Sequence, residues 1–282
     1  MNRTIVTQII PTIQGEGPSV GSPILLVRLG NCNLKCNFCD TKWSNNLKTL
    51  SVKKLSLRET LLPLYVDDTN FSKFETRLRQ TLKNTGIQTI VLTGGEPLIY
   101  KDFIKNLLFS DNLKNIKKVE IETNGVLLNS DDDWEIFGNR KKIVQLNISP
   151  KLNPEYYKSR KVKTLQDIIQ LFNQNYEISI KKILNRSLTY VIWKFVYFEG
   201  ERKVIDKFIE NVNGVDDIYI MPLTPDYNQY KNEMDFLEDY RKSSYDALAY
   251  CIEKGYVFVP RAHIWIFNNF KHRDEFMDVK NL

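Results

Sequence analysis

Short apolar runs rich in β-branched residues alternate along the chain with longer segments of helical periodicity. The runs predict buried strands at Pro23–Leu29, Gln88–Leu92, Lys118–Ile121, Ile143–Ile148, Tyr190–Tyr197, Ile218–Met221 and Tyr256–Val259. The periodic segments predict helices at Phe74–Leu82, Lys101–Leu108, Thr164–Phe172, Glu201–Val212 and Met234–Glu253. Strands that alternate with helices form βα units and a parallel sheet. Apolar strands without polar breaks fit a sheet that helices cover. The pattern therefore predicts a partial or full α/β barrel.

No internal repeat and no Gly-, Pro- or Ser-rich linker divides the chain, so we expect residues 1–282 to form a single domain. Residues 44–86 separate two predicted strand regions, and we expect an insertion or lid there. The polar residues after position 264 predict a short C-terminal extension. No apolar run approaches the ~18 residues that span a bilayer, and the N-terminus lacks the features of a signal peptide. We therefore expect a cytoplasmic protein without a membrane partner.

Charge adds little to this picture. The 40 Lys and Arg residues against 34 Asp and Glu residues give a net charge of +6, and the basic residues are spread along the chain. This distribution is typical of a solvated basic surface, with a weak preference for anionic ligands as the alternative. The chain has no stripe of alternating basic and aromatic residues, so we do not expect direct nucleic-acid binding.

Three of the four cysteines lie within eight residues, with the spacing Cys-x3-Cys-x2-Cys: Cys32, Cys36 and Cys39. A disulfide framework would scatter an even number of cysteines through a small secreted chain. In a reducing compartment, clustered thiols point instead to metal binding or chemistry. The fourth cysteine, Cys251, lies in an apolar and aromatic stretch, which predicts a buried helix residue.

Three thiolates are one short of the four that close a zinc or iron–sulfur site. Either a distant residue supplies the fourth ligand, with Cys251, His263 and His272 as candidates, or one metal position stays open. The open iron of a [4Fe–4S] cluster can bind the amino and carboxylate groups of S-adenosylmethionine. An electron from the cluster then cleaves the cofactor and releases a 5′-deoxyadenosyl radical. The alternatives are a zinc knuckle and thiols that are merely close in sequence.

Polar motifs follow several of the predicted strands directly. They are the cysteine segment, Thr93–Pro97, Glu122–Gly125, Ser149–Lys151 and Pro222–Pro225. The carboxyl ends of parallel barrel strands meet on one face, where active sites are built. We therefore expect these motifs to share one rim. Glycines there let backbone approach a ligand, Glu96 can accept from an ammonium group, and Lys151 suits a carboxylate.

Together, the cysteine motif and Gly94-Gly95-Glu96-Pro97 resemble the radical S-adenosylmethionine superfamily. More narrowly, the chain resembles the 7-carboxy-7-deazaguanine synthase family. The segments that carry this resemblance are Ile13–Pro18, Val27–Leu29, Cys32–Thr41, Thr93–Leu98, Glu122–Gly125, Ser149–Lys151 and Lys194–Val196. The motif Gln14-Gly15-Glu16-Gly17 is the discriminating one, because other members of the superfamily do not generally share it.

The resemblance implies a partial (β/α)6-type barrel and a lyase that converts 6-carboxy-5,6,7,8-tetrahydropterin into 7-carboxy-7-deazaguanine in 7-deazapurine biosynthesis. The deoxyadenosyl radical takes hydrogen from C6 of the pterin, and the ring then contracts with loss of ammonia. S-adenosylmethionine is regenerated, and Mg²⁺ binds the substrate carboxylate. The implied partners are the pterin, an electron donor such as flavodoxin or ferredoxin, and a second copy in a homodimer.

The resemblance also assigns roles to residues. The [4Fe–4S] ligands would be Cys32, Cys36 and Cys39, and the Mg²⁺ ligand Thr41. The cofactor would be bound by Gly94, Gly95, Glu96, Thr123, Ser149 and Lys151, and the substrate by Gln14, Glu16, Arg28 and His263. No side chain is implied as catalytic, since the cluster and the cofactor generate the radical.

The chain departs from the family near its C-terminus. Arg261 replaces a common Gln two residues before His263, and Ile264 replaces a common Lys. For His263, a satisfied core histidine is the alternative to a substrate contact. Two other functions stay open: another radical enzyme, such as an activase that installs a glycyl radical, and a zinc-stabilised binding module.

Overall fold

The computed structural model describes residues 3–45, 64–138, 141–185, 188–226 and 229–267 of the chain. Its strands are β1 (Thr4–Ile13), β2 (Pro23–Leu29), β3 (Leu64–Val66), β4 (Thr89–Gly94), β5 (Lys118–Thr123), β6 (Ile143–Ile148), β7 (Thr189–Tyr197), β8 (Ile218–Pro222) and β9 (Val257–Phe258). They form one sheet in the order β3-β1-β2-β4-β5-β6-β7-β8-β9. All neighbours from β2 to β9 are parallel, whereas β1 is antiparallel to both β2 and β3.

All of the strands expected from the apolar runs are present, and the mostly parallel, open sheet confirms the partial barrel. Two strands were not predicted. β1 mixes apolar residues with Thr7, Gln8 and Pro11, and a proline inside a run argues against a central strand. Here the proline is tolerated because, among the described residues, β3 pairs only with Thr4–Val6, so the part of β1 with Pro11 pairs on one side alone, with β2. β3 is only 3 residues long, too short for a pattern to emerge.

The helices are α1 (Lys42–Asn45), α2 (Phe71–Leu82), α3 (Lys101–Phe109), α4 (Asp133–Phe137), α5 (Leu165–Asn175), α6 (Lys181–Leu184), α7 (Arg202–Asn211), α8 (Glu233–Lys254) and α9 (Ala262–Phe267). The predicted helices correspond to α2, α3, α5, α7 and α8. The others span six residues or fewer, so they hold too few turns for periodicity to show. Local chemistry sets the boundaries of the long ones. Thr164 and Asp167 form a capping box that starts α5, and Gly255 at φ 73° ends α8.

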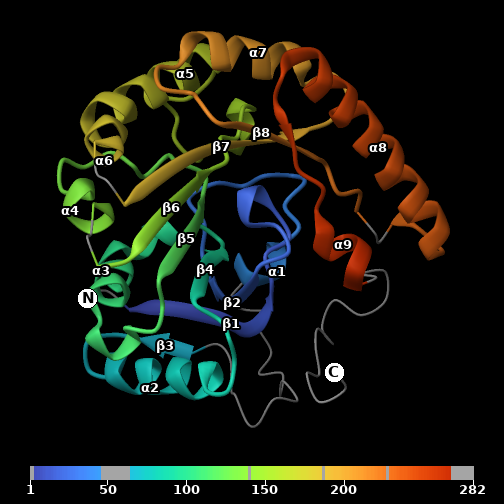
Figure 1. The fold of residues 1–282 in the computed structure, drawn as a ribbon. Coiled ribbons are helices and arrows are strands. Elements are labelled where there is room, and N and C mark those ends of the chain that lie inside the picture. The colour runs from blue at the N-terminus through green and yellow to red at the C-terminus, as the bar shows by residue number, and fades with distance from the viewer. Residues whose placement is uncertain (1–2, 46–63, 139–140, 186–187, 227–228, 268–282) are drawn as a thin grey trace.

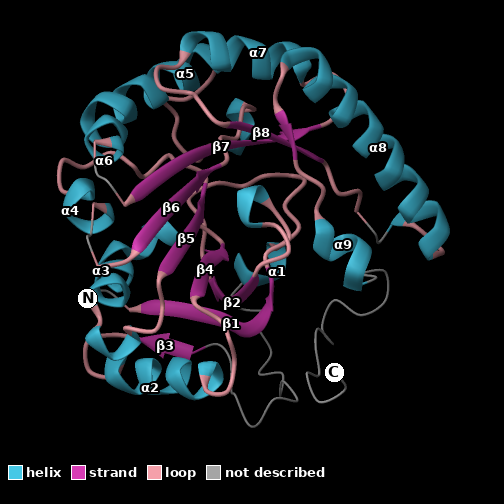
Figure 2. Cartoon of the chain, viewed as in Figure 1, coloured by secondary structure: helices cyan, strands magenta, loops and turns pink. Residues whose placement is uncertain are grey.

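The sheet bends into an arc, with α3 to α8 along its outer side and the loops at the carboxyl ends of the strands gathered within it (Figure 1). Figure 2 shows the strands as one continuous curved layer inside the arc of these helices. The main core lies between the two layers and includes Phe172, Trp193 and Phe208, whose rings pack at 5.2 to 6.2 Å between centroids. The inner side of the arc is left for the loops, which places the polar motifs around one space.

Two predicted appendages are partly described. Within 44–86, the described residues form β3, which pairs with β1, and α2, which buries Phe74 and Leu78 against the core. Positions 46–63 lie outside the described residues, as do 268–282, which include His272. The predicted extension begins within α9, where Ile264 is buried beside Phe236 and Tyr240. In the described ranges, no helix is long and apolar enough to cross a membrane.

Candidate active site

A cavity of about 370 Å³ opens at the carboxyl ends of the parallel strands. All of the site residues expected from the sequence line it: Gln14, Glu16, Arg28, Cys32, Cys36, Cys39, Thr41, Gly94, Gly95, Glu96, Thr123, Ser149, Lys151 and His263. They come from segments on both halves of the chain, and the parallel sheet brings them to the same rim. The expectation that the polar motifs share one face is therefore met by the geometry.

The cysteine loop follows β2 and is clasped by residues 154–158, which follow β6. The Lys35 backbone N–H donates to the carbonyl of Tyr156 at 2.8 Å, and the Tyr156 hydroxyl lies 2.7 Å from Oδ1 of Asn37. The ring of Tyr156 packs edge-on against Phe38, with 5.5 Å between centroids. Lys158 donates to the carbonyl of Cys32 at 2.5 Å. These contacts hold the loop at both of its halves.

The three thiols of the loop are free and half-buried. Burial raises the pKa of Cys32 and raises that of Cys36 to about 11, with the charge of Lys151 acting in the opposite direction for Cys36. Cys251 lies elsewhere, buried on α8 with 3% of its surface exposed, and it does not line the cavity. Its burial fits the expected role as a core residue.

The cysteine loop brings its three thiols to one cavity. Cysteine thiolates are the ligands that hold iron–sulfur clusters, with each thiolate on a different iron. The chemistry of this donor set therefore fits a [4Fe–4S] cluster.

The turn after β4 requires glycine. Gly94 has φ 118°, and a Cβ there would lie 2.2 Å from the carbonyl oxygen of Leu29. Gly95 N–H donates to that same carbonyl at 2.9 Å. The turn thus packs directly on the end of β2, where the cysteine loop begins. No other residue type could bring the two backbones this close.

Glu96 follows this turn, with only 1% of its surface exposed. Its carboxylate accepts from the Thr123 hydroxyl at 2.6 Å and from the backbone N–H groups of Asn124 and Leu98 at 2.8 and 3.0 Å. Burial raises the pKa of Glu96, and these hydrogen bonds oppose the rise. The side-chain amide of Asn124 donates to Oδ1 of Asn33 at 2.7 Å. Hydrogen bonds therefore connect the predicted cofactor residues to the cysteine loop.

Lys151 points to the same cavity from the loop after β6. Its Nζ donates to the carbonyl and the hydroxyl of Ser149, both at 2.8 Å. Burial lowers its pKa, with the nearby thiols and Glu96 acting in the opposite direction. Thr41 also lines the cavity; its hydroxyl donates to the carbonyl of Gly94 at 3.2 Å and lies 3.6 Å from the sulfur of Cys39.

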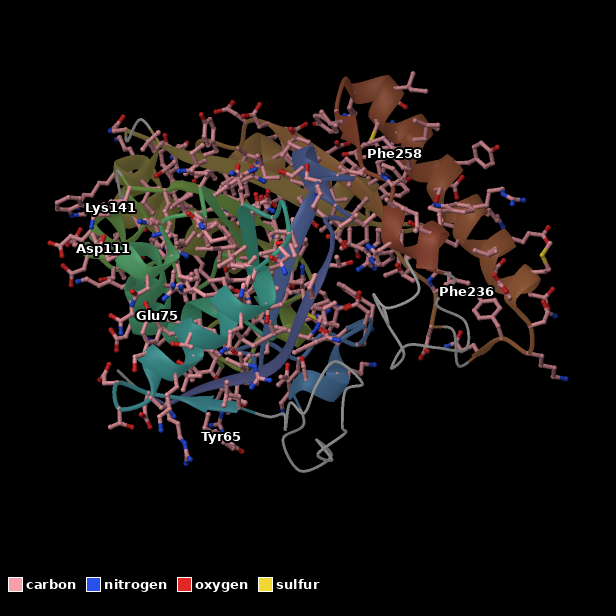
Figure 3. All side chains as sticks on the ribbon, turned by 60° about the horizontal axis from the view of Figure 1, so that its bottom comes forward. Tyr65, Glu75, Asp111, Lys141, Phe236 and Phe258 are labelled. Carbon is pink, nitrogen blue, oxygen red and sulfur yellow. The ribbon has the colours of Figure 1, made fainter. Side chains whose placement is uncertain are left out.

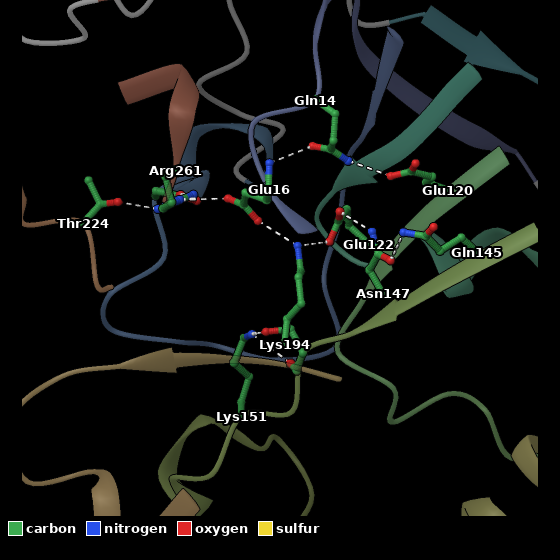
Figure 4. Close-up of polar contacts among 12 residues, drawn as sticks. Gln14, Glu16, Glu120, Glu122, Gln145, Asn147, Lys151, Lys194, Thr224 and Arg261 are labelled. Atoms are coloured by element: carbon green, nitrogen blue, oxygen red, sulfur yellow. Dashed lines mark hydrogen bonds and ion pairs between the residues drawn. The ribbon is translucent and has the colours of Figure 1, made fainter. Parts of the chain in front are cut away.

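A chain of charges, with Lys194 buried and its partners half-buried, lies along the cavity wall (Figure 4). Lys194 lies 2.7 Å from Glu16 and 2.5 Å from Glu122, and Arg261 binds the other oxygen of Glu16 at 2.8 Å. Burial disfavours the ionised form of Glu16, but Lys194 and Arg261 outweigh it and hold its pKa well below the usual range. The same carboxylates keep Lys194 charged, raising its pKa against the effect of burial. Lys194 is 1% exposed, whereas the partners of the outer pair Lys141–Asp111 are 56% and 90% exposed (Figure 3).

The remaining predicted substrate residues flank Glu16. Gln14 accepts from the backbone N–H of Glu16 at 3.2 Å and donates to Glu120 at 2.8 Å. Arg28, near the end of β2, donates to Oε1 of Gln8 at 3.0 Å. His263 packs so tightly on the N-terminal loop that a Cβ at Gly15 would lie 2.0 Å from its Nδ1.

Burial decides the protonation state of His263. Together with the charge of Arg261, it lowers the pKa of this histidine to about 4. The imidazole is therefore neutral at pH 7 and offers one donor and one acceptor.

The roles expected from the sequence do not include several residues at this wall: Asp40, Glu122, Asn147, Lys194, Thr224 and Arg261. One signal was available. Lys194 interrupts the apolar run of β7, and a charge in a buried strand needs a partner. The identity of that partner was out of reach, because Glu16 lies 178 positions away.

An open, mostly parallel sheet with three cysteines and a Gly-Gly-Glu turn on its rim defines a radical S-adenosylmethionine protein. Residues 26–196 match the Radical SAM superfamily, and the chain belongs to it. Membership implies a [4Fe–4S] cluster and S-adenosylmethionine as cofactors.

Among curated proteins, the chain is similar to 7-carboxy-7-deazaguanine synthases. It is 36% identical over 125 residues to that of Clostridium acetobutylicum, a match that covers 44% of this chain and 47% of the relative. The chain thus spans about half the length of this relative. It is 27% identical over 268 residues to that of Rhodopirellula baltica, covering 94% of this chain and 87% of the relative. The fold resembles the crystal structure of QueE from Escherichia coli, with a TM-score of 0.55, 18% identity and coverage of 93% and 96%.

Proposed function

We propose that this chain converts 6-carboxy-5,6,7,8-tetrahydropterin into 7-carboxy-7-deazaguanine. One observation carries the proposal: Glu16, on the discriminating Gln14–Gly17 loop, lies in the same cavity as the cysteine loop and is held ionised by Lys194 and Arg261. A radical site alone would not need this carboxylate. The names of the relatives support the same activity.

The cofactor half of the cavity would hold the cluster and S-adenosylmethionine. The cluster ligands would be Cys32, Cys36 and Cys39. The cofactor would lie against Gly94, Gly95, Glu96, Thr123, Ser149 and Lys151. When bound, these groups supply a carbon radical that takes hydrogen from C6 of the pterin. The carboxylate of Glu96 would accept from the N–H of the cofactor's amino group, and the Nζ of Lys151 would donate to its carboxylate.

The substrate half would orient the pterin. Glu16 presents a carboxylate to the ring N–H donors, and Arg28 presents a guanidinium to the substrate carboxylate. Gln14 and the neutral His263 can each donate one hydrogen bond and accept another. The main effect of such residues is to hold the reacting carbon in one position, because this orientation removes an entropic part of the activation barrier.

Magnesium would bind at Thr41. The hydroxyl of Thr41 donates its proton to the carbonyl of Gly94, which leaves its lone pairs for a cation. Mg²⁺ is a hard ion that keeps several of its water ligands. One hydroxyl from the protein and one carboxylate from the substrate are therefore enough to bind it.

The same proposal covers the wider setting. Residues 1–282 would act as a single radical S-adenosylmethionine domain with a lid or insertion at 44–86 and an extension after 264, paired in a homodimer. An electron donor such as flavodoxin or ferredoxin would reduce the cluster. A cytoplasmic location would supply the reducing conditions that three thiolates need.

An anaerobic assay tests the function. The reconstituted protein is incubated with the pterin, S-adenosylmethionine, Mg²⁺ and a chemical reductant, and the product is read by mass spectrometry. We expect 7-carboxy-7-deazaguanine to form over many turnovers without net loss of S-adenosylmethionine. Cleavage of S-adenosylmethionine without this product would reject the pterin and leave the radical chemistry in place.

A further inference from the structure

Arg261 sits where four segments of the chain meet. Its own backbone N–H donates to the hydroxyl of Tyr240 on α8 at 3.1 Å. The next residue, Ala262, donates to the carbonyl of Gly15 at 3.0 Å. These contacts dock the start of α9 beside the loop that carries Glu16, and Arg261 and His263 both line the cavity.

The guanidinium uses each of its three nitrogens on the protein itself. Nε binds Oε1 of Glu16 at 2.8 Å and Nη2 binds Oδ2 of Asp40 at 2.6 Å. Nη1 donates to the hydroxyl of Thr224 at 2.5 Å. The three acceptors belong to the loop after β1, the cysteine loop and the loop after β8. The planar guanidinium of arginine directs its N–H groups at fixed angles toward three acceptors. The compact ammonium group of a lysine could not reach all three.

The charges around Arg261 alternate. Asp40, Arg261, Glu16, Lys194 and Glu122 form a continuous series of ion pairs, as far as the described residues show. Without the arginine, Glu16 would keep Lys194 at its second oxygen, and Asp40 would lose its guanidinium contacts. The first oxygen of Glu16 would then be free to rotate toward Lys194 or solvent. Arg261 therefore determines the direction in which Glu16 presents its lone pairs.

We propose that Arg261 is a positioning residue for substrate recognition: it orients Glu16 and is itself anchored by Asp40 and Thr224. This inference rests on the proposed pterin substrate for its main readout. It assigns Arg261 no contact with the substrate, since its nitrogens are directed at protein oxygens. It also makes Asp40 and Thr224 act on the substrate only through the arginine.

The main test compares pterin binding by calorimetry in the reconstituted protein with S-adenosylmethionine present. Arg261→Gln should weaken pterin binding by about 10-fold to 100-fold, within the range of about 2-fold to 160-fold expected for residues coupled in one ion-pair network. Iron content, S-adenosylmethionine affinity and uncoupled cofactor cleavage should stay at wild-type levels. Arg241→Gln, which removes the same charge from an exposed position on α8, is the matched control and should change nothing.

A double-mutant cycle separates positioning from general damage. Asp40→Asn should weaken pterin binding in the wild-type background and add nothing in the Arg261→Gln background. Arg261→Lys should fall between wild type and Arg261→Gln, because it keeps the charge and loses the fork. Equal pterin affinities of wild type and Arg261→Gln, or a parallel loss of iron and S-adenosylmethionine affinity, would overturn the proposal.

Failure of the proposed function can be told apart from failure of this inference. If the wild-type protein does not bind the pterin, the proposed activity is wrong, and thermal unfolding of variants at Glu16 and Arg261 decides the role of Arg261. Glu16→Gln and Arg261→Gln should then be non-additive in their effects on the unfolding midpoint. Additive effects would show that Arg261 does not position Glu16.

Discussion

Nζ of Lys194 lies 2.7 Å from the carboxylate of Glu16, although 178 positions separate the two residues in the chain. The same Nζ lies 2.5 Å from Glu122, so one buried cation serves two carboxylates. Lys194→Met keeps the length of the side chain and removes the charge. Breaking a buried pair in this way typically lowers the free energy of unfolding by about 3–5 kcal/mol.

The loss should depend on pH. In the wild type, the lowered pKa of Glu16 adds stability that is present above its usual pKa and lost as the pH falls through the lowered value. Burial already raises the pKa of Glu122 against the charge of Lys194, and Lys194→Met should raise it further. A carboxyl with a raised pKa destabilises the fold while it is ionised, so the variant should recover stability relative to wild type as the pH falls from 8 to 5. Urea unfolding at several pH values measures this. A pH-independent difference would contradict the predicted role of Lys194.

The cluster assignment predicts a clear division among the cysteines. Replacing Cys32, Cys36 or Cys39 by Ala should abolish the iron–sulfur absorbance and all cleavage of S-adenosylmethionine. Cys251→Ala is the control, and it should retain both, since Cys251 is buried on α8 away from the cavity. Loss of the cluster in Cys251→Ala, with the fold intact by circular dichroism, would make the assignment wrong.

Magnesium should act through Thr41. Thr41→Val keeps the shape of the side chain and removes the oxygen ligand. Turnover should fall, while iron content and S-adenosylmethionine binding persist, because the cysteines and the Gly-Gly-Glu turn are unchanged. Steady-state rates with and without Mg²⁺ check this. Equal wild-type rates in both conditions would contradict the proposed role of Mg²⁺.

Arg28 should affect the affinity for the pterin and not the cluster or the cofactor. Removing one partner of a buried charged hydrogen bond typically costs about 2–5 kcal/mol, or ~30-fold to several thousand-fold in affinity. Arg28→Ala should therefore weaken pterin binding by at least the lower figure and leave the cluster spectrum and uncoupled cofactor cleavage unchanged. Calorimetric titration of the pterin provides the measurement. An unchanged affinity would mean that Arg28 is structural or that the pterin is not the substrate.

Tyr156 should stabilise the loaded cysteine loop. Its hydroxyl lies 2.7 Å from Oδ1 of Asn37, between Cys36 and Cys39, and its ring packs on Phe38. Tyr156→Phe keeps the ring and removes about 0.5–1.5 kcal/mol of hydrogen bonding. We expect a cluster that forms normally and decays several-fold faster in air, as followed by absorbance. Tyr190→Phe, at a residue 54% exposed, is the control, and equal decay rates in the two variants would refute a specific role for the clasp.

Periodicity found the strands and helices that carry the architecture, because buried strands must be apolar and amphipathic helices must repeat every three to four residues. It missed β1, whose polar residues and proline disguise a strand that pairs along nearly its whole length with β2. It also missed the short helices, including α9, whose Ile264 is buried against α8.

The cysteine loop, the Gly-Gly-Glu turn and their placement at strand ends can be read from the sequence, because motif spacing and strand direction are local properties. The pairing of charges along the cavity wall follows from the fold. Arg261 and Lys194 reach Glu16 from segments 245 and 178 positions away. No local pattern predicts which buried carboxylate such a cation will meet, since the pairing depends on how the whole sheet curves. The curvature of the sheet brings Lys194 of β7 and Arg261, which precedes α9, to the carboxylate of Glu16, and these two cations keep it ionised.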